Sequence, residues 1–156
     1  MNKNLKKKNV KTINIGFDLE IEEDGWPPIS TEILQGLPLG DDKAKIDNTP
    51  FFVSSIAHGD IIEVYKSDSS EYYHCKRLIQ EGGNYALSII LRNHEHKESI
   101  VKLLSKSSEF YEYGEFGKTI MYAVSLTNDR AYKDIKANLD SLEKKEIISY
   151  AELCLA

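Results

Sequence analysis

The sequence has little cysteine, a shortage of positive charge and no long apolar run, and each shortage excludes a class of protein. Its two cysteines, Cys75 and Cys154, are too few and too far apart for a disulfide scaffold, so we expect a reducing, cytoplasmic setting. No apolar run approaches the ~18 residues that span a membrane. The 25 acidic residues outnumber the 20 Lys and Arg residues, which disfavours nucleic-acid phosphates and favours a basic partner.

Signatures of catalysis and of cofactor binding are also missing. The pairs His74-Cys75 and His94-x-His96 fit no standard zinc spacing. Neighbouring residues of a strand point to opposite faces, so we do not expect His74 to activate Cys75. No glycine-rich loop is followed by the Lys-Ser/Thr of a phosphate-binding loop. We therefore predict no catalytic residue, no metal ligand and no cofactor.

What the sequence does contain is the pattern of a globular chain with two different halves. Residues 12–21 alternate polar and apolar side chains, which predicts a half-buried strand. Turn residues then separate four further short segments with strand character, at 32–39, 43–48, 60–66 and 71–80. We expect a small antiparallel β-lobe, a partial barrel, over residues 12–81, after a disordered basic tail at 1–11.

The second half alternates strands with helical patterns. Strand segments are predicted at 85–92, 110–113, 118–126 and 149–155, with a hairpin turn over Gly114-Glu115-Phe116-Gly117. Apolar stripes at helical spacing lie between them, the first preceded by Asn93 as an N-cap and the second by several capping side chains at Thr127-Asn128-Asp129. The order strand, helix, strand, strand, helix, strand predicts a ferredoxin-like lobe over residues 84–156 that packs on the β-lobe, in an α+β protein.

The segment Asp47-Asn48-Thr49-Pro50-Phe51-Phe52 is the most distinctive stretch of the chain, and Gly59-Asp60 follows it closely. One interpretation is structural: Asp and Asn side chains bond nearby backbone, Pro50 fixes φ, and the phenylalanines anchor the segment. Gly59 suits a positive φ and Asp60 caps the next turn. The other interpretation is a pocket for a small molecule or a substrate around Asp47, Asn48, Phe51 and Asp60.

These residues also carry a family resemblance. Leu39-Gly40, the segment Asp47 to Phe52 and the turn Gly59-Asp60 are similar to the pattern of a bacterial family known as domain of unknown function 4265. The resemblance extends to Trp26-Pro27 and to the closing segment 150–155. It implies a small stand-alone bacterial protein and no particular mechanism.

A second candidate surface combines aromatic and acidic residues, which suit a basic protein partner. It comprises Glu109, Tyr111, Glu112, Tyr113 and Glu115. The leading hypothesis is a non-catalytic protein-binding module, by analogy of size and charge an immunity protein that neutralises a bacterial toxin. The pocket described above is the alternative from another class. Nucleic-acid binding is a third, which the acidic charge and the absence of an RNA-binding aromatic motif both disfavour.

Overall fold

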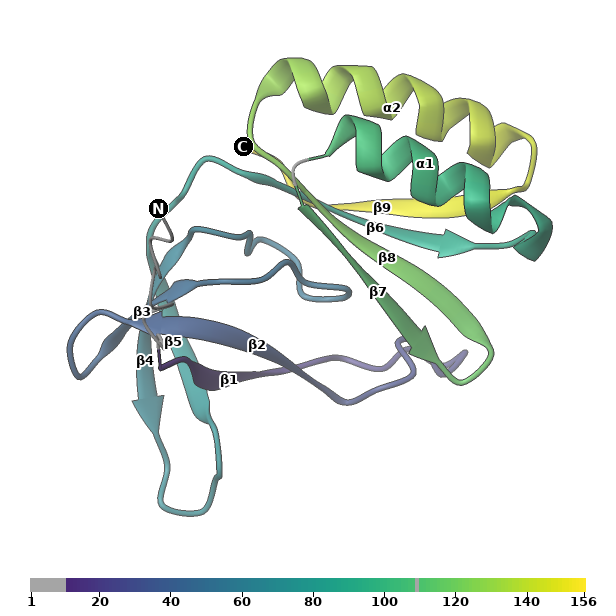
Figure 1. The fold of residues 1–156 in the computed structure, drawn as a ribbon. Coiled ribbons are helices and arrows are strands. Elements are labelled where there is room, and N and C mark those ends of the chain that lie inside the picture. The colour runs from purple at the N-terminus through teal and green to yellow at the C-terminus, as the bar shows by residue number, and fades with distance from the viewer. Residues whose placement is uncertain (1–10, 109) are drawn as a thin grey trace, which may run out of the picture.

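The computed structural model describes residues 11–108 and 110–156, so the predicted tail is outside it except for Lys11. The chain is a mixed α+β protein with a five-stranded and a four-stranded sheet and two helices (Figure 1). In chain order the elements are β1 Ile13–Asp18, β2 Thr31–Pro38, β3 Lys43–Ile46, β4 Ile61–Lys66, β5 Tyr73–Gln80, β6 Tyr85–Leu91, a 3-10 turn His94–His96, α1 Lys97–Ser107, β7 Phe110–Phe116, β8 Thr119–Leu126, α2 Asp129–Lys144 and β9 Ile148–Cys154.

The first five strands form a closed barrel, which corrects the expectation of a partial, wholly antiparallel one. Neighbouring strands pair antiparallel from β1 to β5. The barrel closes where β1 and β5 pair in parallel, with Ile15 opposite Tyr73. Sequence alternation identifies strands and their faces but not this last pairing, because strands distant in sequence meet only in the folded chain.

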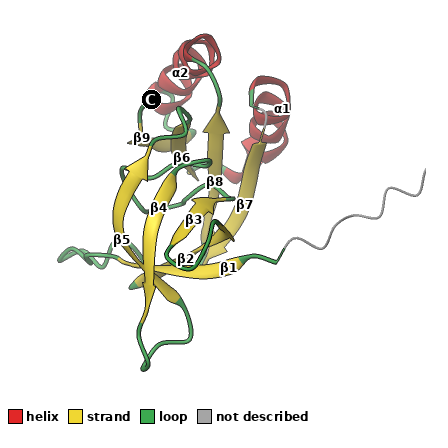
Figure 2. Cartoon of the chain, turned by 90° about the vertical axis from the view of Figure 1, so that its left-hand side faces the viewer, coloured by secondary structure: helices red, strands yellow, loops and turns green. Residues whose placement is uncertain are grey.

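The four-stranded sheet has the order β7-β8-β6-β9, and all its pairs are antiparallel. Both helices cover one face of this sheet, and the barrel lies on the other side (Figures 1 and 2). The two predicted caps are present: Asn93 Oδ1 accepts from Glu95 N at 3.1 Å, and Asn128 Oδ1 accepts from Ala131 N at 2.8 Å. These bonds satisfy backbone donors that the first turn leaves free.

The β7–β8 hairpin is tighter than the sequence suggested. We expected its turn at Gly114 to Gly117, but β7 continues to Phe116 and only Gly117 and Lys118 form the turn. Gly117 takes φ +64°, a backbone conformation that suits glycine. The longer hairpin carries Gly114 and Phe116 out over the barrel side of the sheet.

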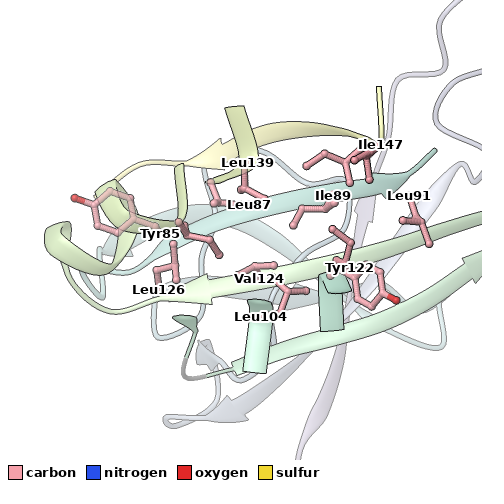
Figure 3. Packing of buried hydrophobic residues seen from close by; sticks show 13 residues of the cluster. Tyr85, Leu87, Ile89, Leu91, Leu104, Tyr122, Val124, Leu126, Leu139 and Ile147 are labelled. Carbon is pink, nitrogen blue, oxygen red and sulfur yellow. The ribbon is translucent and has the colours of Figure 1, made fainter. Parts of the chain in front are cut away.

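The main hydrophobic core lies between the sheet and the helices (Figure 3). Alternate residues of the central strands β6 and β8, among them Leu87, Ile89 and Val124, meet Leu104 of α1 and Leu139 of α2. A second core fills the barrel around Ile15, Leu34 and Ile62. No helix in the described part of the chain has the length and apolar character needed to cross a membrane.

Candidate functional site

A cleft of about 700 Å³ opens between the barrel and the uncovered face of the four-stranded sheet. One wall comes from β1, the loop that follows it, the segment 51–54 and part of β5. The opposite wall comes from β6, β8 and β9, through Ser88, Ile90, Met121, Ser149, Ala151 and Leu153. Its size falls within the ~300–1,000 Å³ that is typical of small-molecule sites.

The sheet wall of the cleft has small residues around Ser88, beside the larger Ile90, Met121 and Leu153. Because side chains alternate along a strand, Ser88 points away from the core that contains Leu87 and Ile89. Its neighbours across the sheet are Ala123 of β8 and Ala151 of β9. These short side chains leave room between the sheet and the barrel that larger residues would occupy.

Ser88 is the polar group of this wall that has no partner. Its side chain is buried, with only 4% of the residue exposed, and its hydroxyl makes no hydrogen bond within the described protein. A buried hydroxyl without a partner costs about 1–3 kcal/mol. Such a group on a cleft wall is therefore a candidate for contact with a bound molecule.

The barrel wall contains a cluster of aromatic rings. Trp26 and Phe52 meet edge to face with centroids 5.7 Å apart. Phe116, from the β7–β8 hairpin, lies 4.9 Å from Phe52 and 5.3 Å from Phe51. Gly114 allows this approach, because a Cβ there would lie 2.9 Å from Phe51 Cζ. The rings thus join the barrel to the sheet at one end of the cleft.

A buried carboxylate holds the aromatic segment in place. Glu32 of β2 is 5% exposed, and its two oxygens accept hydrogen bonds from three consecutive backbone N–H groups at 2.6–2.9 Å. The three donors are Phe51, Phe52 and Val53. Burial raises the pKa of Glu32, although these three bonds oppose the shift. Sequence reasoning missed this residue, because an acidic residue in a strand with alternating burial looks like a solvent-facing one.

The first part of the distinctive segment Asp47 to Phe52 ties it to the barrel, and the two phenylalanines at its end line the cleft. Asn48 Oδ1 accepts from Gln35 N at 2.9 Å, which ties the segment to β2, while Thr49 and Pro50 are buried. Asp47 is exposed, and its carboxylate lies 4.0 Å from His58. Phe51 and Phe52 line the cleft, but Asp47 and Asn48 do not.

Gly59 and Asp60 also serve the structure of a turn. Gly59 has φ +89°, and Asp60 is 2% exposed. The carboxylate of Asp60 accepts from Ala57 N at 2.9 Å and from Gly82 N at 2.7 Å, which fixes the turn to the connection between the two halves. The polar groups of the pocket expected around Asp47, Asn48, Phe51 and Asp60 therefore do not converge, since each bonds nearby backbone or faces solvent.

The expected acidic-aromatic surface is split between two faces of β7. The rings of Tyr111 and Tyr113 contact Tyr122 on the helix-covered face, where Glu115 accepts from the Tyr113 hydroxyl. Glu112 alternates to the barrel side, where burial and the charge of Glu32 raise its pKa. The remaining member, Glu109, is outside the described residues. Neighbouring residues of a strand point to opposite faces, so these residues are close in the sequence but separated in the structure.

The histidine and cysteine pairs show no metal-binding arrangement. Among residues 11–108 and 110–156, no three His, Cys, Asp or Glu side chains are grouped so that they could hold a metal ion. Burial raises the pKa of the Cys75 thiol, which lines the cleft, and also that of Cys154. A raised pKa lowers the thiolate fraction and hence the nucleophilicity of both.

The fold and site together define an α+β protein with a closed five-stranded barrel, a helix-covered four-stranded sheet and a cleft between them. The chain belongs to the family described as Domain of unknown function (DUF4265), whose model matches residues 32–150.

A similar solved structure is described as a novel crystal structure of a hypothetical protein from Neisseria gonorrhoeae. It has a TM-score of 0.69 and 23% sequence identity, and the match covers 93% of this chain and 94% of that one. At this identity the likeness shows the fold alone. No curated protein matches the chain.

Proposed function

We propose that the chain is a ligand-binding protein that holds a small organic molecule in the cleft between the barrel and the sheet. The observation that carries this proposal is the unpartnered Ser88 hydroxyl, buried on the wall of a cleft of about 700 Å³. Aromatic and aliphatic side chains supply apolar contact area around it, including Trp26, Phe52 and Met121. A largely apolar cleft with a few polar groups is the usual form of a small-molecule site.

The experiment is a small-molecule screen by thermal shift, followed by a variant that fills the cleft. Ala151 is exposed on β9 and lines the cleft, so Ala151→Trp should occupy the space without disturbing a core. The matched control is Ala137→Trp, on the exposed face of α2. Compounds that raise the Tm of the wild type and of Ala137→Trp, but not of Ala151→Trp, support the proposal. Retained stabilisation of Ala151→Trp contradicts it.

We further propose that binding is not accompanied by catalysis and that the chain works in the cytoplasm. The raised pKa values of the Cys75 and Cys154 thiols support the first point, because they disfavour thiolate chemistry. The two cysteines are both free, which supports a reducing compartment.

We also propose two lobes, a barrel lobe over residues 12–81 and a ferredoxin-like lobe over 84–156. The strand order β7-β8-β6-β9, with two helices on one face, supports this assignment.

Protein binding, of the kind an immunity protein uses against a toxin, is the second candidate function. The observation that favours it is the position of β7 at the edge of its sheet, where Tyr113 is 42% exposed beside Glu115. An exposed edge strand offers backbone groups to a partner. A pull-down with tagged protein tests this: a stoichiometric basic partner lost with Tyr113→Ala, but kept with Leu78→Ala on the exposed surface of β5, supports it. A partner that binds both variants equally contradicts the hypothesis that it binds through β7.

A further inference from the structure

The charges that line the cleft all have one sign, apart from one histidine. The carboxylates of Asp18, Glu20 and Glu22 border it, and His74 is the histidine. No Lys or Arg is among the described residues that form its walls. A cleft lined by one sign of charge concentrates ligands of the opposite sign.

The acidic loop is ordered beside the aromatic wall. The backbone of Glu22 donates to the Trp26 carbonyl at 2.8 Å and accepts from Gly25 at 2.9 Å. Asp24 Oδ1 accepts from Trp26 N at 3.0 Å, which closes the turn. This geometry holds the backbone of Glu22 beside that of Trp26, and both residues line the cleft. Within residues 11–108 and 110–156, the carboxylates of Glu20 and Glu22 have no hydrogen-bond or ion-pair partner, so their charge is not neutralised there.

An independent observation on the opposite wall points to a ligand. The Ser88 hydroxyl is more than nine-tenths buried, lacks a partner and borders the same cleft. A hydroxyl can accept a hydrogen bond from an ammonium or guanidinium group or donate one to a neutral polar atom. Trp26 and Phe52 also line the cleft, and aromatic rings attract cations.

We infer that the cleft selects a small organic cation, with an ammonium or guanidinium group on an aromatic or branched apolar body. This inference rests on the proposed function, because it names the ligand class of the same cleft. The apolar body packs against the aromatic wall, and the charged group lies toward the carboxylates of the loop after β1.

The test uses three probes of one shape and different charge: 2-phenylethylammonium, 2-phenylethanol and phenylacetate. Trp26 is the one tryptophan of the chain and lines the cleft, so its fluorescence reports binding directly. The cation should bind about tenfold more tightly than the neutral alcohol, because solvent screens the carboxylates only in part. The difference in affinity between the cation and the anion should be larger than about tenfold. The preference should shrink in high salt.

The double variant Glu20→Gln/Glu22→Gln should reduce the advantage of the cation over the alcohol, with Asp18 still in place, and leave the affinity for the alcohol unchanged. Its matched control is Asp41→Asn/Asp42→Asn, which removes the same charge from the exposed turn between β2 and β3. The control should keep the preference, because net charge alone does not create it.

The outcomes separate this inference from the proposed function. If the alcohol or the anion binds as tightly as the cation, and Ala151→Trp abolishes that binding, the cation inference is overturned and the ligand-binding proposal stands. A cation preference that is undiminished in Glu20→Gln/Glu22→Gln also overturns the inference. If no probe changes the fluorescence of Trp26 or the Tm up to its solubility limit, the cation inference is overturned, and the ligand-binding proposal is decided by the screen with Ala151→Trp.

Discussion

The two faces of the four-stranded sheet differ, although the same strands build both. On the helix-covered face, Leu87, Ile89 and Val124 are large side chains buried to completion. On the barrel face, their chain neighbours Ser88 and Ala123 are small. The first face forms a close-packed core, while the second leaves a cleft of about 700 Å³. The difference shows that the same strands form a packed core on one face and one wall of a cleft on the other.

The largest expected effect is on the helix-covered face. Leu87→Ala should lower the free energy of unfolding by about 2–5 kcal/mol, because it leaves a cavity in a packed core. Ile90→Ala changes a residue on the cleft side of the same strand. It should lower the free energy of unfolding by at least about 1 kcal/mol less than Leu87→Ala does, because the space it leaves merges with the cleft. Urea unfolding measures both. Equal costs would remove the contrast between the two faces.

The next effect concerns the carboxylate that fixes the aromatic wall. Glu32→Ala removes the acceptors of three backbone N–H groups and should cost about 1.5–3 kcal/mol. The fluorescence of Trp26 should shift as well, because Phe52 loses its anchor. Glu20→Ala, on the exposed loop, is the control and should leave both properties nearly unchanged. A wild-type spectrum and stability for Glu32→Ala would refute the anchoring role.

A smaller effect should appear as a dependence of stability on pH. Burial raises the pKa of both Glu32 and Glu112 above the ordinary value of 4.5. Below 4.5 both carboxyls are protonated in the folded and the unfolded chain, so their burial costs nothing extra. As the pH rises through the window between 4.5 and the raised values, the unfolded chain ionises first and the folded state loses stability.

Urea midpoints measured across this window test the sign. Glu112→Gln removes one of the two carboxyls, so the decline from acidic to neutral pH should become shallower in that variant. A steeper decline, or a wild-type stability that rises through the window, would contradict the effect of burial at these positions.

The smallest effect on stability is expected on the cleft side of β6. Ser88→Ala removes a buried hydroxyl without a partner, so the free energy of unfolding should stay the same or rise by up to about 1 kcal/mol. The same change should weaken ligand binding. Ser125→Ala, at another buried serine of the sheet, is the control for stability and should leave binding intact. A loss of stability in Ser88→Ala would show that its hydroxyl has a structural partner.

Local pattern predicted most of the elements. The alternation along β1, the caps Asn93 and Asn128 and the stripe that includes Ile135 and Leu139 are all local features, and the structure confirms each. Some strands are shorter than predicted, because backbone pairing stops before the alternation of polar and apolar residues does. The first strand, for example, was predicted to reach residue 21, but β1 ends at Asp18.

The site was predictable only in part, because its residues meet through long-range contacts. Two members of the distinctive segment, Phe51 and Phe52, line the cleft, while Asp47 and Asn48 do not. Nothing local identified Glu32, whose partners lie about 20 residues away in sequence, or Ser88, whose surroundings are set by the barrel.

The sequence by itself determined most of the strands and helices and the family, since these depend on side-chain period and on a short motif. The tertiary structure decided the closure of the barrel through β1 and β5, the burial of Glu32 against the backbone of residues 51–53, and the cleft. The physical reason is that a strand specifies which side chains share a face, whereas only packing against distant elements decides whether that face is filled or left open.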